Sequence, residues 1–308
     1  MNNAWRILVA DGLTGDGLAR LRQEAEVVEA GLEAVGTVDG LIVRGRSRVT
    51  GKVVTAGRPR LRVIGRAGVG VDNIDLQAAR QAGIVVVHAP LAATLSVAEH
   101  ALALMFALAR RLPSADAGLR RGEWHKAELE GSELFDKTLG IFGLGRIGRA
   151  LAQRAGALGM RVLGHDPLLS PEAIRQAGAT PVAFENLLAE SDYVSLHVPL
   201  DAATRGLLGR EAFARMKPGA RLISTSRGGV VDEAALLQTL DSGRLAGAAL
   251  DVFEHEPPGI TPLTTHPSVI LTPHIAAQTT EAQARASADI AAEVLAALRG
   301  EPLRWRVA

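Results

Sequence analysis

The sequence contains no cysteine. It therefore has no disulfide framework, no thiolate nucleophile and no cysteine-ligated metal, and we expect no bound metal ion. Phe, Trp and Tyr together make up 3% of the 308 residues, and the formal net charge at pH 7 is +1. With few rings for base stacking and no basic field for a phosphate backbone, the composition argues against a nucleic-acid partner.

Long hydrophobic runs are also missing. The most apolar segment, Ala101–Ala109, is far shorter than the roughly 20 residues that a membrane-spanning helix needs. The first residues, Met1–Asp11, lack the extended apolar core of a signal peptide. We therefore expect a cytoplasmic protein that binds no membrane, and the chain length suggests two domains.

Short apolar runs alternate with helical patterns along both halves of the chain. In the first half we expect strands at residues 6–10, 27–29, 40–44, 62–65 and 85–88, and helices at 16–24 and 76–81. A buried helix at 96–110 and a polar stretch with little periodicity at 114–133 follow. The remainder predicts six strands at 138–142, 161–165, 192–197, 220–224, 246–250 and 268–271, and an amphipathic helix at 281–299. Such alternation predicts an α/β protein with two doubly wound parallel-sheet domains.

A glycine-rich turn opens the second half. Gly143, Gly145 and Gly148 stand in the order Gly-x-Gly-x-x-Gly between an apolar segment that ends at Phe142 and a helical pattern that continues from Arg149. In a dinucleotide site the first glycine permits a tight turn, the second lets the backbone approach a pyrophosphate, and the third lets helix and strand pack closely. The helix N-terminus would offer N–H groups and a partial positive charge to the phosphates.

An acidic residue completes this pattern. Asp166 directly follows the next apolar run, residues 160–165. Its carboxylate can accept hydrogen bonds from both hydroxyls of the adenosine ribose and would repel a 2′-phosphate. The sequence therefore predicts NAD, rather than NADP, as the cofactor.

Polar side chains stand where the later strands should end. They include Ser195, His197, Arg227, Asp251, Glu254, Glu256 and His274. Ligands of open parallel sheets bind at this edge. Hydride transfer at a carbon that bears oxygen also needs a proton carrier for that oxygen, and histidine suits this role near neutral pH. An arginine can hold a substrate carboxylate through two parallel hydrogen bonds.

The residue types alone leave several assignments open. His88, His165 and His197 compete with His274 as the proton carrier, and Glu254 competes with Glu256 as its partner. A carboxylate beside the histidine would orient the ring and favour its charged form.

Several segments together give the chain a resemblance to a known family. They are residues 40–44, 65–75, 143–148 with Asp166-Pro167, 226–233, 249–258 and 272–274. In these motifs the sequence resembles the D-isomer-specific 2-hydroxy acid dehydrogenases, and the resemblance covers essentially the whole chain. Within that family it is most similar to the branch that oxidises 3-phosphoglycerate. The resemblance implies a Rossmann NAD-binding domain, residues 94–277, inserted into a flavodoxin-like substrate domain, residues 1–93 plus 278–308.

The same resemblance implies a role for each candidate residue. Arg227 would bind the substrate carboxylate and carbonyl, His274 would be the general acid and base, and Glu256, favoured over Glu254, would pair with it. The residues implied for cofactor binding are Gly143, Gly145, Arg146, Ile147, Gly148, Asp166, His197, Val198, Thr225, Ser226, Asp251, Ala276 and Ala277. Among these, Asp251 would face the nicotinamide carboxamide. The residues implied for substrate binding are Arg44, Arg66, Val69, Gly70 and Lys126.

The implied reaction is NAD-dependent oxidation of 3-phosphoglycerate to 3-phosphohydroxypyruvate, of the serine-biosynthesis type. We also expect a homodimer, because the apolar helix 96–110 is followed by the polar stretch 114–133, which can wrap around a neighbouring subunit. No serine-sensing regulatory domain is expected after the last helix.

Two departures from the family pattern leave other substrates open. Leu-Ala-Ala-Thr at residues 91–94 replaces an Asn-Gly-Asn-Ser/Thr stretch that is usual in the family, and Val69 stands where this branch often has threonine. Reduction of hydroxypyruvate, glyoxylate or another 2-keto acid is therefore the alternative activity. An NAD-sensing, corepressor-like binding protein is the alternative of a different class.

Overall fold

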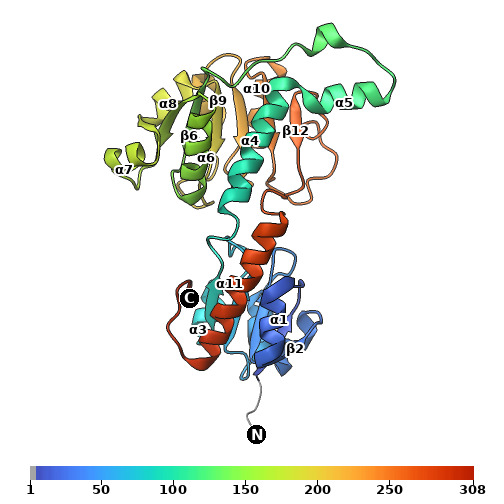
Figure 1. The fold of residues 1–308 in the computed structure, drawn as a ribbon, viewed down its shortest axis with the longest axis vertical. Helices are drawn as coiled ribbons and strands as arrows, with labels where there is room; N and C mark the ends of the chain where they lie inside the picture. The colour runs from blue at the N-terminus through green and yellow to red at the C-terminus, as the bar shows by residue number, and fades with distance from the viewer. Residues whose placement is uncertain (1–4) are drawn as a thin grey trace. The chain divides into compact units, whose positions relative to one another are not determined.

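The computed structural model describes residues 5–308. They form two compact units, one made of the residues up to Thr94 together with Ala277–Ala308, the other of Leu95–Ala276. Figure 1 shows each unit as a sheet flanked by helices. Within the described part of the chain, no helix combines the length and the apolar character that crossing a bilayer requires.

The first unit is built on a five-stranded sheet. Its strands are β1 (Trp5–Val9), β2 (Ala25–Val28), β3 (Gly40–Val43), β4 (Val63–Arg66) and β5 (Val85–His88). They pair in parallel in the order β2-β1-β3-β4-β5, which is the flavodoxin-like order. The connecting helices are α1 (Gly15–Glu24), η1 (Leu32–Thr37), α2 (Gly51–Gly57) and α3 (Leu76–Gln81).

The last helix, α11 (Thr280–Arg299), belongs to this first unit. Its buried side chains Ile290 and Val294 share one core cluster with Ile7, Ile42 and Val63 of the sheet. The residues after α11 then run along the outer edge of β5, where the backbone N–H of Val86 donates to the Ala308 carbonyl at 3.0 Å. The edge strand is therefore covered by the end of the chain.

The second unit contains a seven-stranded parallel sheet. Its strands are β6 (Thr138–Phe142), β7 (Arg161–His165), β8 (Thr180–Pro181), β9 (Tyr193–Leu196), β10 (Arg221–Ser224), β11 (Gly247–Leu250) and β12 (Val269–Leu271). Their order is β12-β11-β10-β9-β6-β7-β8, the doubly wound Rossmann arrangement with one strand added beyond the usual six. The predicted fold class is confirmed in both units, but the expectation of six strands was wrong because β8, at two residues, has no recognisable pattern.

Among the described residues, eight helical segments accompany the strands of this second sheet in the chain. They are α4 (Thr94–Arg110), α5 (Leu112–Arg120), η2 (Lys126–Leu129), α6 (Arg146–Ala157), α7 (Pro171–Gln176), α8 (Phe184–Glu190), α9 (Arg210–Arg215) and α10 (Glu233–Asp241). The expectation of little regular structure at 114–133 was wrong, since α5 and η2 lie there. Arg111 adopts a left-handed conformation, with φ 51°, and ends α4 before α5 begins. The apolar pattern that predicts α4 therefore does not extend into α5.

Helix α4 packs directly on the sheet. Ala98, Ala101 and Met105 lie in the same buried cluster as Ile223 of β10 and Ala249 of β11. Small alanine side chains let the helix approach the strands closely, and His100 of this helix lies near the end of β12, with its Nε2 3.1 Å from Thr272 Oγ1.

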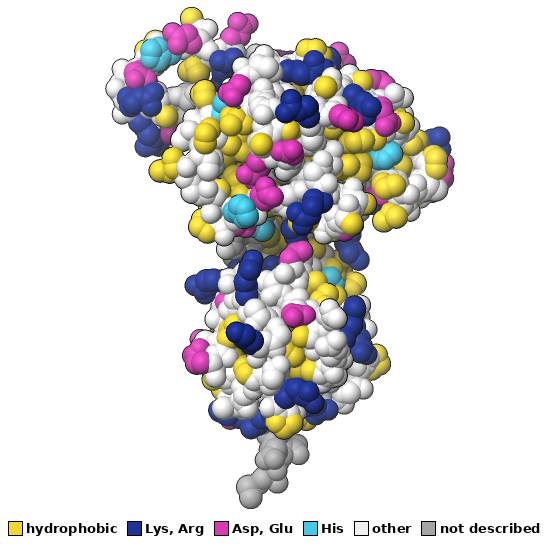
Figure 2. All heavy atoms as spheres, turned by 180° about the vertical axis from the view of Figure 1, so that it is seen from behind, with side chains coloured by type: hydrophobic (Ala, Val, Ile, Leu, Met, Phe, Trp, Pro, Cys, Tyr) yellow, Lys and Arg dark blue, Asp and Glu magenta, His cyan; other side chains and the backbone are white. Residues whose placement is uncertain are grey.

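The surface carries both signs of charge. On the face in Figure 2, Lys and Arg side chains are interspersed with Asp and Glu, and hydrophobic atoms are exposed between them. This distribution agrees with the near-zero net charge of the sequence.

Candidate active site

In the second unit, the last residues of six neighbouring strands are paired with one another across the sheet. Phe142 pairs with His165 on one side and with Leu196 on the other, and the row continues through Ser224, Leu250 and Leu271. The residue after the row on each strand therefore emerges at the same edge of the sheet. In spatial order from β7 to β12, these residues are Asp166, Gly143, His197, Thr225, Asp251 and Thr272. All but Thr272 are among the predicted cofactor-binding residues.

The glycine-rich turn has the backbone that its sequence predicts. Gly143 adopts φ 90°, and a Cβ there would lie 2.7 Å from the His197 carbonyl oxygen. A Cβ on Gly148 would overlap the Gly143 carbonyl oxygen. By contrast, a Cβ on Gly145, which precedes α6, would meet no atom within 4 Å. The backbone is thus open at the helix N-terminus, where the N–H groups of Arg146 and Ile147 can face an anion.

Asp166 fastens this turn to the end of β7. Its Oδ2 accepts a hydrogen bond from the Leu144 backbone N–H at 2.8 Å, and its Oδ1 accepts one from Leu168 N–H at 3.0 Å. A carboxylate offers about four acceptor positions, so each oxygen keeps capacity for a ribose hydroxyl.

Three buried polar atoms near the strand ends fit a polar ligand. Among the described residues, His197 Nδ1, Thr225 Oγ1 and Ser226 Oγ are shielded from solvent and have no hydrogen-bond partner within the protein. Leaving such groups unpaired is costly. A dinucleotide bound along the sheet edge, beside the open turn at Gly145, would supply the missing partners.

The structure separates the competing histidines. Burial lowers the pKa of His197 to about 4, so this ring is neutral at physiological pH and poorly suited to carry a catalytic proton. His165 donates from Nδ1 to the Val182 carbonyl at 2.9 Å and stacks on Phe142, which gives it a packing role. His88 lies in the first unit and donates from Nδ1 to the Val69 carbonyl at 2.8 Å.

His274 has the geometry of a proton carrier. Its Nδ1 lies 2.8 Å from Glu256 Oε2, and its side chain is 50% exposed. Glu256 is in turn held by the Phe253 backbone N–H, which donates to Oε1 at 3.1 Å. Because Nδ1 is engaged by the carboxylate, Nε2 on the opposite side of the ring is the nitrogen that can exchange a proton with a ligand. The carboxylate paired with His274 is that of Glu256 and not that of Glu254, whose backbone N–H donates to Glu233 Oε1 at 2.7 Å.

Two opposing effects set the pKa of Glu256. Burial alone would raise it, but the hydrogen bond from His274 and the attraction of its charge, with the Phe253 N–H, bring the pKa of Glu256 below its usual value. Glu256 is therefore a carboxylate at neutral pH and places a negative charge 2.8 Å from His274 Nδ1.

Asp251 holds the turn that carries His274. Its fully buried carboxylate accepts hydrogen bonds from Thr272 Oγ1 at 2.6 Å, Ile275 N–H at 2.8 Å and Ala276 N–H at 2.9 Å. Between these anchors, His274 adopts φ 53°, a left-handed conformation that is unusual for a residue with a side chain. The hydrogen bonds to Asp251 therefore hold the chain on both sides of His274 in place.

Arg227 follows β10 and lies in a loop next to the one that carries Glu256. The side chain donates from Nη1 to the Ser226 carbonyl at 2.7 Å and is half-buried. A Cβ on the neighbouring Gly228 would overlap the Phe253 carbonyl oxygen, so the loops after β10 and β11 touch. The loop of Arg227 and the loop of Glu256 are thereby brought together.

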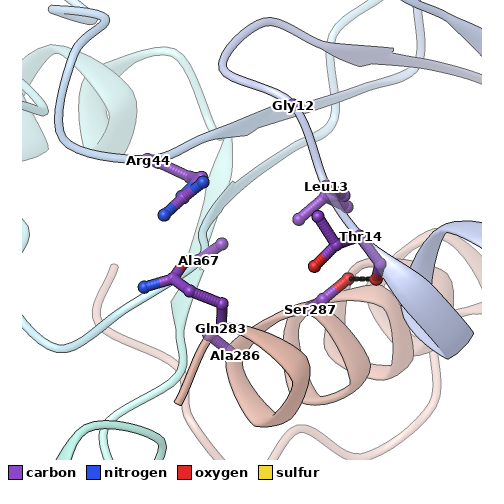
Figure 3. Close-up of a pocket in the computed structure, with 8 residues that line it drawn as sticks. All are labelled: Gly12, Leu13, Thr14, Arg44, Ala67, Gln283, Ala286 and Ser287. Carbon is purple, nitrogen blue, oxygen red and sulfur yellow. Dashed lines mark hydrogen bonds between the residues drawn. The ribbon is translucent and has the colours of Figure 1, made fainter. Parts of the chain in front are cut away.

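The predicted substrate-binding residues of the first unit lie at the ends of β3 and β4 or in the loops that follow them. Figure 3 shows a hollow of this unit into which Arg44 and Gln283 project, lined also by the loop after β1 and by α11. Arg44 donates from Nη2 to Gln278 Oε1 at 3.0 Å. Arg66 pairs with Val43 in the sheet, and its Nη2 would be 3.8 Å from a Cβ on Gly45. The two arginines thus share one end of the sheet.

The remaining predicted residues lie in two places. Val69 and Gly70 form a half-buried loop after β4 that His88 supports. Lys126 begins η2 of the second unit and is exposed. Sequence reasoning missed His100 and Thr272, which join the network of Asp251: His100 Nε2 lies 3.1 Å from Thr272 Oγ1 and 3.5 Å from Asp251 Oδ1.

Comparisons with known proteins identify the family of the chain. Residues 102–276 match the family model of the D-isomer specific 2-hydroxyacid dehydrogenase NAD binding domain. A D-3-phosphoglycerate dehydrogenase of Bacillus subtilis is 44% identical over 305 residues, which are 97% of this chain and 58% of that protein. The chain thus spans a little over half the length of this curated relative.

Solved structures show the same fold. The TT0316 protein from Thermus thermophilus has a TM-score of 0.90 at 39% identity, covering 98% of this chain and 100% of that one. A glyoxylate reductase from Paecilomyes thermophila has a TM-score of 0.89 at 31% identity, covering 100% and 99%. D-Lactate dehydrogenase from Aquifex aeolicus, complexed with NAD and lactic acid, has a TM-score of 0.83 at 30% identity, covering 96% of each chain.

The chain therefore belongs to the D-isomer specific 2-hydroxyacid dehydrogenase family. Its second unit is the NAD-binding domain of that family, which confirms the predicted cofactor and the predicted class, an NAD-dependent oxidoreductase.

Proposed function

We propose that this chain oxidises D-3-phosphoglycerate at C2 to 3-phosphohydroxypyruvate with NAD as the hydride acceptor. The observation that carries the proposal is the His274–Glu256 pair, with Nδ1 and Oε2 2.8 Å apart, on a turn at the carboxyl edge of an NAD-binding sheet. The relatives named for this reaction support the choice of substrate. The cysteine-free sequence suits the reducing cytoplasm, which we propose as its compartment.

The residues of the chain divide the chemistry between them. Arg227 holds the substrate carboxylate through two N–H donors, which orients C2 and its hydroxyl. The turn at Gly143 and Gly145 and the carboxylate of Asp166 would hold NAD, which would supply the acceptor for the hydride on C2. The hydroxyl O–H bond breaks as the carbonyl forms, and its proton passes to Nε2 of His274. The carboxylate of Glu256 stabilises the resulting imidazolium through Nδ1.

Arg44 and Arg66 are proposed to recognise the phosphate. Both guanidinium groups lie at the same end of the first sheet, and the planar fork of arginine matches phosphate oxygens well. Val69 and Gly70 would add backbone contacts to the substrate carboxylate, and Lys126 a further cation.

Reduction of glyoxylate or another 2-keto acid is the second candidate. It is favoured by the similarity to a glyoxylate reductase and by residues 91–94, where Leu91 is a large exposed apolar side chain in place of the usual amides. An NAD-binding corepressor-like role is disfavoured because the Arg227 loop and the His274–Glu256 pair are both present.

A substrate panel tests the proposal. We expect kcat/KM with D-3-phosphoglycerate to exceed that with D-glycerate, glycolate and D-lactate at least about 10-fold, the effect of one good charge-assisted contact. Arg44→Gln should remove most of that advantage while leaving turnover of D-lactate unchanged. Higher kcat/KM with an unphosphorylated acid would favour the second candidate, and no turnover of any acid would contradict both.

Cofactor choice depends on Asp166. We expect NAD to be used with higher kcat/KM than NADP, because the carboxylate repels a 2′-phosphate. Asp166→Asn should narrow this preference while keeping an acceptor for the Leu144 N–H. Equal use of both cofactors by the unaltered chain would contradict the assignment.

His274 and Glu256 should respond differently to substitution. His274→Ala should lower kcat by about 10²–10⁴-fold and leave NADH binding, measured by fluorescence, unchanged. Glu256→Gln keeps the shape but removes the charge that favours protonated His274. Keto-acid reduction needs that proton, so its pH–rate profile should move acidward, with a larger loss near pH 8 than near pH 6. An unmoved profile, or near-full turnover by His274→Ala, would refute these roles.

We propose that the chain forms a homodimer through residues 112–135. Leu119, Trp124 and Phe135 are 60%, 80% and 66% exposed there, and Figure 1 shows α5 and η2 projecting from the body of the second unit. Three large exposed apolar side chains on one segment support an interface there, since contiguous apolar patches mark protein interaction sites. Sedimentation should give a dimer at micromolar concentration, weakened by Trp124→Glu but not by the control Ile260→Glu. A monomeric unaltered chain would contradict the proposal.

A further inference from the structure

A second histidine, His100, contacts the residues that hold the turn of His274. His100 belongs to α4, which packs on β10 and β11, and its side chain is 18% exposed. Its Nε2 lies 3.1 Å from Thr272 Oγ1 and 3.5 Å from Asp251 Oδ1. Thus α4, β11 and β12 meet at one cluster of three polar side chains.

The protons of this cluster can be assigned from its contacts. Burial alone would raise the pKa of Asp251, but hydrogen bonds from His100, Thr272 and two backbone N–H groups hold the pKa of Asp251 below its usual value. The carboxylate is therefore ionised and can only accept. The one hydroxyl hydrogen of Thr272 is donated to Asp251 at 2.6 Å, so Thr272 Oγ1 can only accept from His100. It follows that Nε2 of His100 carries a hydrogen.

The cluster controls a backbone conformation that does not persist without support. His274 adopts φ 53° between Thr272, whose carbonyl accepts from the His274 N–H at 3.0 Å, and Ile275, whose N–H donates to Asp251. Left-handed residues other than glycine are held in place by their surroundings. The direction of the His274 ring, and hence its bond to Glu256, depends on this turn.

We propose that His100 is a positioning residue for His274, acting through Thr272 and Asp251. Its Nε2–H bridges the hydroxyl and the carboxylate, so that the turn keeps His274 directed at Glu256. His100 forms its polar contacts with Thr272 and Asp251 and none with His274 or Glu256, so its effect is indirect. The inference rests on the proposed function of His274 as the proton carrier.

Substitutions at residue 100 test the proposal in the full chain. His100→Ala should lower kcat for keto-acid reduction by roughly 10- to 100-fold, as expected for a lost hydrogen bond to a charged group, with NADH binding unchanged. Its pH–rate profile should move acidward, as in Glu256→Gln, because the His274–Glu256 bond loosens. His100→Gln, whose amide can donate from nearly the same place, should restore kcat to within about 3-fold of the unaltered chain, since the bridging hydrogen bond is regained.

A matched control comes from His266. Its Nε2 lies 3.6 Å from Asp241 Oδ1 and its side chain is 13% exposed. It forms no hydrogen bond or ion pair with residues 272–276. His266→Gln should leave kcat and the pH profile unchanged. Thr272→Val, which keeps the shape and removes the bridge, should reproduce the effect of His100→Ala and serves in its place if that variant does not fold. Thr272→Ser keeps the bridging hydroxyl and should therefore keep kcat close to that of the unaltered chain.

The outcome for His100 is separable from that for the proposed function. If His274→Ala is impaired while His100→Ala and Thr272→Val keep full kcat and an unmoved profile, only the positioning role is overturned. If His274→Ala keeps its turnover, the proposed function fails. A readout that needs no turnover is the ¹⁵N spectrum of the histidine-labelled chain at fixed pH: the Nδ1 resonance of His274, which reports its hydrogen bond to Glu256, should shift in His100→Ala and return in His100→Gln. An unchanged Nδ1 resonance of His274 in His100→Ala would overturn the proposal.

Discussion

The alignment of strand ends in the second sheet is the constraint on which the site depends. Because β7, β6, β9, β10, β11 and β12 are parallel and in register, the next residue on each strand emerges at the same edge. Residues as distant in sequence as Gly143 and Thr272 therefore lie at the same edge of the sheet. A register slip in any strand would turn its contribution away from this edge, so the hydrophobic core that fixes the register also fixes the site.

The kind of functional group differs between the two ends of this edge of the sheet. Near β6 and β7 the backbone itself is the functional group, and Gly143 and Gly148 are needed because a side chain would collide with the neighbouring backbone. Near β11 and β12 the functional groups are side chains, and a strained turn presents His274. The buried carboxylate of Asp251 compensates that strain with three hydrogen bonds, which favour a single arrangement of the turn.

Much of this arrangement was predictable from local sequence signals. The glycine spacing, the acid after β7 and the alternation of strands and helices are short-range patterns, and the structure bears out the fold that they predict. The pairing of His274 with Glu256, rather than Glu254, followed only from the family resemblance, because two acids two residues apart look alike in a sequence. His100 escaped notice because its partner Thr272 is 172 residues away, and no local pattern reports such a contact. Helix α5 and strand β8 were missed because one follows a break at Arg111 and the other has only two residues.

The central claim is that a hydride leaves C2 of a 2-hydroxy acid for NAD while His274 takes the hydroxyl proton. The most direct measurement supplies the chain with NAD and D-3-phosphoglycerate that carries deuterium at C2, and follows the label by mass spectrometry. Deuterium should appear in the reduced nicotinamide and be absent from the 2-keto acid, and both products should be lost in His274→Ala although NADH still binds. Retention of deuterium in the organic acid, with no reduced cofactor formed from any 2-hydroxy acid, would contradict it.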